Sequence, residues 1–265
     1  MNQILKLSDE EYFGTKALSN SFLIQFDRSP AHAFTPISQT DGMKMGTMIH
    51  QFILTPELFN ETYIIAPPEI PSDKRTSAYK EFAKGQTKEI LFKSDLIELE
   101  HIRDNVLKYE FEGSCIKDYL SVSEKEISLF WDLNLQNKNV QCKGKGDMLF
   151  ISGDRGIIFD FKKTQDCTKF GKSVEQYKYY RQANFYTTGL KILYPKLTSV
   201  RFIFLTVEES SPYGVLDYEL DEEYMYEGEK ENYYSILKYL NWNGNTNEVY
   251  PNQTVTLRKP GWLCA

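Results

Sequence analysis

The chain has 265 residues, 41% of them hydrophobic and 26% charged, which is enough to bury the core of one large domain or of two small ones. No apolar run approaches the roughly 20 residues of a membrane span, and the N-terminal stretch lacks the pattern of a signal peptide, so we expect a cytoplasmic protein without membrane contact. The formal net charge of -6 is not the usual signature of a nucleic-acid-binding protein, although local lysine clusters matter more than the total.

The cysteines argue against two cofactor classes. They are scattered and form no C-x-x-C pair: Cys115, Cys142, Cys167 and Cys264. This spacing disfavours a zinc site and an iron–sulfur cluster. In a reducing compartment we expect free thiols rather than disulfides.

The N-terminal part, residues 1–60, is predicted to be helical. Ser19 is a good N-cap for one helix, and Ser29-Pro30 ends it. Residues 41–54 form a further helix with an apolar stripe, in which Gly46 and His50 lie four positions apart on one face. A mid-helix glycine costs about 1 kcal/mol relative to alanine, which suggests that something approaches the backbone near His50. A core glycine and a satisfied histidine are the alternative.

The next segment alternates helices with one strand. We expect a helix from Pro56, a strand over 63–66, a helix over 75–84, and an amphipathic helix over 91–109 capped by Ser94.

The catalytic core is expected over 120–208, where strands 122–132, 140–151 and 156–162 form an antiparallel meander. Asp160 and Lys162 are two apart and share one strand face. The hairpin brings Asp147 beside Asp160, and Glu126 points into the same sheet as a third acidic candidate.

Acidic side chains on a half-buried sheet face are destabilising unless they are paired or bind a metal. Oxygen ligands of this kind suit a hard cation such as Mg2+. An ordinary Asp–Lys ion pair on a solvated face, with Glu126 as an exposed strand charge, remains open from the residues alone.

The C-terminal half continues with a long helix over 169–194, on which Gln182 and Tyr186 share a face. Strands over 201–207 and 213–220 and a helix over 221–240 follow, and residues 241–265 are an irregular tail. With no repeat and no linker, residues 1–265 are predicted to form a single domain.

The ordered set Gly46-x-x-x-His50, Glu126, Asp147, Asp160-x-Lys162 and Gln182-x-x-x-Tyr186 resembles the PD-(D/E)xK nuclease superfamily. The branch with a helical histidine and a Q-x-x-x-Y helix includes lambda exonuclease and RecB-type nuclease domains. The chain is most similar to RecE-type exonucleases, the exonuclease VIII group of phage recombination proteins. The resembling segments are ALSNSFLIQFDRSPAHA, GTMIHQFILTPELF, EISLFWD, CKGKGDML, IIFDFKKTQD and YYRQANFYTTGL, and together they cover roughly residues 10–190.

The resemblance implies a restriction-endonuclease-like α/β core, with a central mixed sheet flanked by helices. It implies a Mg2+-dependent 5′-to-3′ exonuclease that digests double-stranded DNA from its ends and leaves 3′ overhangs for a phage-type single-strand annealing protein. Mn2+ would substitute for Mg2+, with one or two ions per site. A homo-oligomeric ring of three or four subunits, in a bacterial or phage-infected cell, is also implied.

The resemblance assigns roles by position. The metal ligands would be His50, Glu126, Asp147, Asp160 and the backbone carbonyl of Phe161. Lys162 would position or deprotonate the attacking water, and Gln182 and Tyr186 would orient the site. The residues expected to contact DNA are Lys143, Lys145, Lys163, Lys169, Lys172 and Arg181.

Two departures from the family pattern concern substrate contacts more than the metal site. Lys163 stands where a threonine is usual, and lysines replace arginines before Asp147. Alternative functions are a catalytically silent DNA-binding protein on a nuclease-like scaffold and an endonuclease of the same superfamily. An iron–sulfur nuclease akin to CRISPR-associated helper nucleases is disfavoured by the scattered cysteines.

Overall fold

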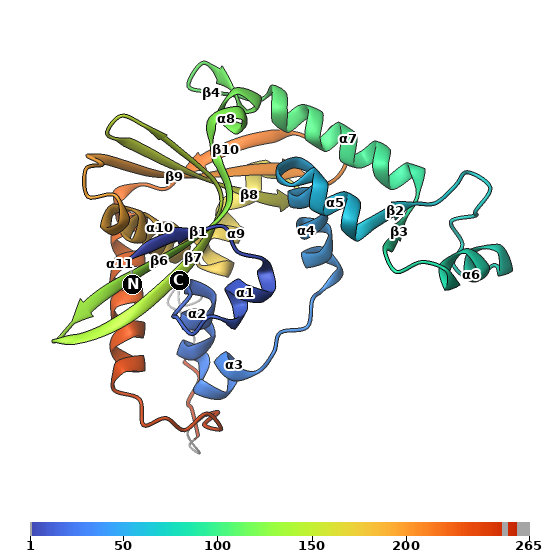
Figure 1. Cartoon of the computed structure of the whole chain (residues 1–265). Coiled ribbons are helices and arrows are strands. Elements are labelled where there is room, and N and C mark those ends of the chain that lie inside the picture. Colours follow the sequence, from blue (N-terminus) through green and yellow to red (C-terminus); the bar gives the residue numbers. More distant parts are fainter. Residues whose placement is uncertain (1, 251–253, 259–265) are drawn as a thin grey trace.

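The computed structural model describes residues 2–250 and 254–258. Its centre is a six-stranded sheet with the strand order β1-β6-β7-β8-β9-β10. β8 and β9 pair in parallel, and the other neighbours in this sheet are antiparallel. Helices cover both faces of the sheet, which gives a three-layer arrangement (Figure 1). The predicted mixed α/β architecture is therefore confirmed.

The sheet contains the predicted meander as its β6–β8 portion. The strands are β1 (Gln3–Leu5), β6 (Glu124–Leu135), β7 (Lys138–Ser152), β8 (Arg155–Thr164), β9 (Ser199–Glu208) and β10 (Val215–Glu219). Only β1 was not expected from the sequence, because three residues are too few to establish a period.

The two faces of the sheet are covered by different helices. One face carries α2 (Asn20–Arg28), α9 (Phe170–Tyr177), α10 (Tyr179–Leu193) and α11 (Glu222–Leu240). The other carries α4 (Asp41–Leu54), α5 (Pro56–Thr62), α7 (Lys93–Lys108) and α8 (Ile116–Val122). Shorter helices are α1 (Asp9–Gly14), α3 (Pro30–Phe34), α6 (Ser77–Lys84) and the 3-10 turn η1 (Cys167–Lys169).

Alternation along the central strands fills two separate cores. On β9, Phe202 and Phe204 pack with the α2/α9/α10/α11 layer, while Ile203 and Leu205 pack with the α4/α5/α7/α8 layer. Burying side chains of this size stabilises the fold by about 1.5–3 kcal/mol each. A strand buried on both faces tolerates a charged side chain only at a specific site, which makes Asp160 on β8 exceptional.

Two small sheets lie outside the central one. β2 (Tyr63–Ile65) pairs in parallel with β3 (Glu89–Leu91), and the intervening α6 lies on an arm at the right of Figure 1. β4 (Glu110–Phe111) and β5 (Ser114–Cys115) form a short hairpin. Among the described residues, no helix combines the length and apolar character needed to cross a membrane.

The helix starts follow the capping chemistry in most places. Ser19 caps α2 by accepting from the Phe22 amide, as predicted, and α4 has the predicted bounds. The predicted cap of α7 is wrong. The helix is capped at Phe92, whose amide donates to the Asp95 carboxylate at 2.8 Å, so the acid three positions into the helix replaces Ser94.

The predicted single helix over 169–194 is also wrong, because it is two helices. Lys178 adopts a left-handed backbone with φ of 55°, which ends α9 and begins α10. Its ammonium lies 2.6 Å from the Glu231 carboxylate on α11. The described part of the predicted tail, 241–250 and 254–258, contains no helix or strand, and the rest of that prediction lies outside the described residues.

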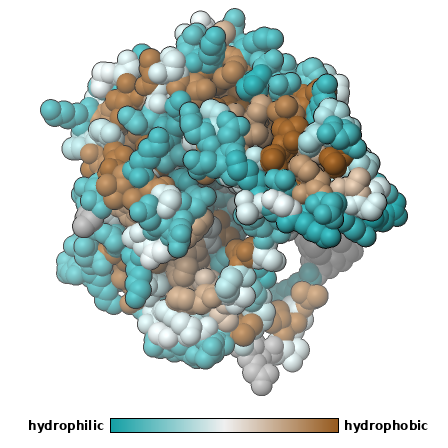
Figure 2. Space-filling model, turned by 45° about the vertical axis from the view of Figure 1, so that its right-hand side comes forward, coloured by the Kyte–Doolittle hydropathy of each residue, from teal (hydrophilic) through white to brown (hydrophobic). Residues whose placement is uncertain are grey.

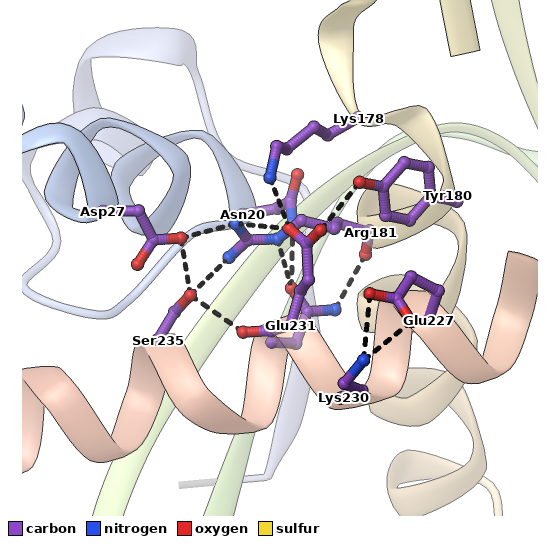
Figure 3. A network of polar contacts seen from close by, with 10 residues as sticks. Asn20, Asp27, Lys178, Tyr180, Arg181, Glu227, Lys230, Glu231 and Ser235 are labelled. Atoms are coloured by element: carbon purple, nitrogen blue, oxygen red, sulfur yellow. Dashed lines mark hydrogen bonds and ion pairs between the residues drawn. The ribbon is translucent and has the colours of Figure 1, made fainter. Parts of the chain in front are cut away.

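A buried polar network fixes the start of α10 (Figure 3). Arg181 is fully buried, and its guanidinium donates to Asp27 of α2 at 2.5 Å. It also donates to Asn232 at 3.1 Å and Ser235 at 2.8 Å, both on α11. A buried arginine with several partners holds its surroundings in one geometry, because removing any partner leaves charge unsatisfied.

Gly228 sits where α11 crosses α10, and we expect Gly228→Ala to destabilise the fold. An added Cβ would lie 2.5 Å from the Tyr180 carbonyl oxygen and 3.0 Å from the Asn184 Cβ, so the helices must separate. Overpacking of this kind costs about 1–3 kcal/mol, measurable by urea unfolding. Gly171→Ala in α9 is the matched control, since nothing lies within 4 Å of its added Cβ. Equal stability of the two variants would contradict the proposed crossing.

Candidate metal centre

Three predicted ligands converge at one end of the meander. His50, Glu126 and Asp147 offer ligand atoms that all lie within 4.8 Å of one another. Within residues 2–250 and 254–258 this is the one group of three or more histidine, cysteine or acidic side chains so arranged. The sequence positions span α4, β6 and β7, so only the tertiary fold brings them together.

The strand register sets the two acids opposite each other. Lys125 pairs with Met148 and Ile127 with Gly146, which leaves Glu126 and Asp147 at the opposed positions between them. On the other side of β7, Met148 pairs with Phe159, so the next opposed position to Asp147 is Asp160. Strands β6, β7 and β8 therefore each carry one carboxylate, and the three lie side by side across the sheet. For Asp147 and Asp160 this is the neighbourhood that the hairpin predicted.

The regular pleat is interrupted at these positions. Gly146 lies against Ile127 and Ile158, within the core on the α10 side, and Leu149 belongs to that same core. Gly146 and Leu149 are three positions apart, and residues three apart point to opposite faces of a regular strand. The alternation of side chains between the two faces of β7 therefore shifts once between them. Glu126 has a left-handed backbone with φ of 52°, which is unfavourable for a residue with a side chain. Such local strain concentrates at functional sites.

Helix α4 delivers the imidazole. Ile49 and Ile53 are buried against the sheet, which places His50 at the edge of the buried face, half-buried. His50 Nε2 lies 2.9 Å from the Phe161 carbonyl oxygen. A carbonyl can only accept, so Nε2 carries the proton. In metal sites, the histidine nitrogen that does not bind the metal usually donates its proton to a backbone carbonyl or a carboxylate in this manner.

The other imidazole nitrogen faces Asp147. His50 Nδ1 lies 3.6 Å from Asp147 Oδ2, and the same oxygen accepts from the Phe161 amide at 2.7 Å. A nitrogen lone pair and a carboxylate repel each other at this distance unless a proton or a metal cation lies between them. The donor set therefore fits a divalent cation. Phe161 O keeps one lone pair beyond its bond to His50, so it remains available as the predicted backbone ligand.

Burial and neighbouring charge act together on Asp147. Burial is the main cause that raises its pKa, to about 7, and the negative charges of Asp160 and Glu126 raise it further. The charges of His50 and Lys162 oppose this shift. A carboxyl group with so high a pKa is unfavourable in its ionised form, and a bound cation would relieve that penalty.

Asp160 stands beside the three-residue cluster rather than within it. It is buried, its carboxylate forms an ion pair with Lys162, and Gln182 Nε2 donates to Asp160 Oδ1 at 2.7 Å. Burial of Lys162 tends to lower its pKa. Attraction to the Asp160 carboxylate, with smaller contributions that include Asp147, outweighs this effect, so the pKa of Lys162 is raised. The ammonium also lies 4.9 Å from the ring centre of Tyr179, a residue that no motif identified.

Tyr186 reaches the site from the same helix face as Gln182, as predicted. Its hydroxyl accepts from the Lys145 amide at 3.3 Å. The ring passes directly over β7, where an added Cβ on Gly144 would lie 2.9 Å from Tyr186 Cε1. Burial raises the pKa of Tyr186 to about 12, so the hydroxyl remains a proton donor at neutral pH.

The structure corrects two of the six predicted DNA contacts. Lys143 is buried, and its ammonium donates to the carbonyls of Tyr12 and Thr15, at 2.8 Å each. Arg181 is fully buried in the α2/α10/α11 network (Figure 3). Neither cation is available to a phosphate. Both were misassigned because a basic residue in a strand or helix carries no sign of which face it occupies.

The other four basic residues are at least partly exposed. Lys169 is the last residue of η1 and Lys172 lies in the first turn of α9; both are exposed, and Lys169 pairs with Asp166 at 2.6 Å. Lys163 is mostly covered and pairs with Glu209. Lys145 lies between two acids, Glu126 at 2.9 Å and Asp9 at 2.5 Å. The contact with Asp9 was not predicted, since no local pattern links α1 to β7.

The glycine interpretation on α4 needs correction. Apart from the adjacent residues and the helix's own backbone, no atom of the described residues lies within 4 Å of the Cβ position of Gly46, one turn before His50. The helix is therefore not packed closely there, and the space is open. Figure 2 shows the surface hollowed between an upper and a lower part of the molecule.

The comparisons with known proteins agree with this geometry. The family model described as "PDDEXK-like domain of unknown function (DUF3799)" matches residues 19–253. A crystal structure of a protein from Eubacterium rectale that carries the provisional name of an exonuclease has a TM-score of 0.61 at 13% identity, over 89% of this chain and 86% of that chain. At this identity the likeness shows the fold alone.

A second structure, of a protein called SSO0001, has a TM-score of only 0.30 at 17% identity, over 73% of this chain and 86% of that chain, and supports no inference. The search of curated proteins finds no match.

Asp147→Asn should stabilise the metal-free protein at high pH. The folded pKa of Asp147, about 7, exceeds its ordinary value of 3.8, so the wild type loses stability as pH rises between these values, whereas a neutral amide does not. At pH 8 in EDTA we expect the variant to melt a few degrees higher, with a smaller difference at pH 5. Added Mg2+ should reverse the order, because only the wild type binds it. A variant that is less stable at pH 8 in EDTA would contradict this assignment.

Proposed function

The chain belongs to the family of PDDEXK-like domains of unknown function (DUF3799), and on that premise we propose that it is a metal-dependent nuclease that hydrolyses DNA. The observation that carries the proposal is the adjacency of two groups. The His50/Glu126/Asp147 donor cluster lies next to the buried Asp160–Lys162 ion pair. A structural role would require neither the strained Glu126 nor a carboxyl group with a pKa near 7.

The cation proposed for this site is Mg2+, with Mn2+ as a substitute and one or two ions per site. His50, Glu126 and Asp147 would hold it, with Asp160 and the Phe161 carbonyl as further ligands. Oxygen-rich ligand sets suit these cations, and an imidazole is compatible with Mn2+. When bound, the ion supplies Lewis-acid chemistry, by acidifying water and offsetting charge on the phosphate.

Lys162 acts as a cation in this site. The raised pKa keeps its ammonium protonated, so it is suited to donate to a phosphate oxygen or to the attacking water rather than to remove a proton. Hydrolysis forms a bond from the water oxygen to phosphorus and breaks the bond to the leaving sugar oxygen. The attacking water loses one proton and the leaving oxygen gains one, so the step is balanced. Gln182 fixes the Asp160 carboxylate, and the Tyr186 hydroxyl keeps a proton to donate to the substrate.

The finer assignment is a 5′-to-3′ exonuclease on double-stranded DNA ends. It rests on the ordered motifs, which resemble RecE-type enzymes, and on the provisional exonuclease name of the Eubacterium rectale protein. The 3′ overhangs would pass to a single-strand annealing protein, and the active form would be a homo-oligomeric ring of three or four subunits. Lys145, Lys163, Lys169 and Lys172 are the proposed phosphate contacts, which position DNA without reading sequence.

Lys162→Gln and Asp160→Asn should each lower the rate of Mg2+-dependent DNA hydrolysis by about 10²–10³-fold, the usual effect of removing one charge-stabilising group. Both substitutions preserve side-chain shape approximately, so thermal unfolding should remain cooperative. Lys230→Gln is the matched control, because it removes an exposed lysine on α11 that pairs with Glu227. Wild-type rates in a folded Lys162→Gln variant would exclude the mechanism.

Strand-specific products should show the polarity. With linear duplex labelled at either end, we expect Mg2+-dependent loss of the 5′-terminal nucleotides and a persisting 3′ strand, and no product in EDTA. Digestion from 3′ ends alone would refute the polarity. Cleavage of closed circles would identify an endonuclease, and binding without hydrolysis would identify a silent DNA-binding protein.

A further inference from the structure

Lys145 occupies an unusual position beside the metal centre. Its ammonium lies 2.9 Å from Glu126 Oε2, and Glu126 is one of the three clustered donors. The same ammonium lies 2.5 Å from Asp9 Oδ1 on α1. One cation is thus shared between a proposed metal ligand and a carboxylate that is not part of the three-residue cluster.

Both anchors of this arrangement are fixed by the fold. The Lys145 amide donates to the Tyr186 hydroxyl, which holds the strand under α10. Helix α1 is held by a capping box between Ser8 and Glu11, and the carbonyl of Tyr12 accepts from Lys143. Asp9 therefore reaches Lys145 from the first turn of a capped helix.

An ammonium on Glu126 and a divalent cation on Glu126 repel each other, so they compete for the carboxylate. For Glu126 to turn fully toward a bound ion, Lys145 must release it. When Lys145 releases Glu126, its ammonium keeps Asp9 as a partner. This matters because the Lys145 side chain is only about one-fifth exposed, and an unpaired charge there would be unfavourable.

We propose that Lys145 is a built-in competitor for the cation site and that Asp9, as a positioning residue, sets the divalent-ion affinity by competing with Glu126 for the Lys145 ammonium. This inference rests on the proposed metal centre, and it gives a role to Asp9, which lies outside the nuclease motifs. It concerns ion binding, so its test does not require DNA hydrolysis.

The test is calorimetric titration of the purified full chain with Mn2+ at constant pH and salt. Lys145→Gln should bind Mn2+ more tightly and Asp9→Asn more weakly than the wild type, each by about fivefold or more, a common coupling between interacting sites. Glu10→Gln is the matched control for Asp9→Asn, because it removes the same charge from the neighbouring exposed position of α1 without contacting Lys145. It should leave the affinity within twofold.

The double variant decides how Asp9 acts. If Asp9 works through Lys145, Asp9→Asn should have little effect once Lys145 is Gln, whereas a simple long-range charge would keep its full effect. An undiminished effect, or unchanged affinity in Lys145→Gln, overturns the inference and leaves the metal centre intact. Absence of Mn2+ uptake by the wild type and by Lys145→Gln overturns the metal centre and the proposed function together.

Discussion

The site depends on an excess of negative charge that the fold gathers in a poorly solvated place. β6, β7 and β8 each present one carboxylate at the same level of the sheet, and burial raises the pKa of the central one, Asp147, to about 7. Lys162 compensates Asp160, and Lys145 partly compensates Glu126. Asp147 accepts from the Phe161 amide and faces the imidazole of His50 across 3.6 Å. A divalent cation is the simplest group that satisfies all of these side chains at once.

The surrounding architecture holds this charge in place from three directions. α4 supplies His50, α1 supplies Asp9, and α10 supplies Gln182 and Tyr186. α10 is itself fixed by the buried Arg181 network with α2 and α11 (Figure 3) and by the break at its start. The elements that carry these side chains are thus attached to both layers of helices, which explains how residues distant in sequence come together at one place on strands β6, β7 and β8.

The sequence predicted most of the helices and strands well, because their signals are local. Capping residues and an apolar stripe define α4, and turn residues define the meander. The predictions failed where they depended on which face of a helix or strand a side chain occupies, or on contacts between residues far apart in the sequence. Arg181 and Gln182 are adjacent, yet one is buried between helices and the other contacts Asp160. A helical period does not say which face meets the sheet. Lys178 adopts a left-handed backbone although glycine is the residue that usually marks this conformation, so the break between α9 and α10 was missed. The Asp9–Lys145 contact joins residues 136 positions apart, which no local pattern predicts.

The most direct test of the account is an anomalous difference map from a crystal soaked in Mn2+ and measured at the manganese absorption edge. The account predicts a peak at coordination distance from an imidazole nitrogen of His50 and from carboxylate oxygens of Asp147 and Glu126. A map without a peak there, with these side chains ordered and Mn2+ in excess, would contradict it.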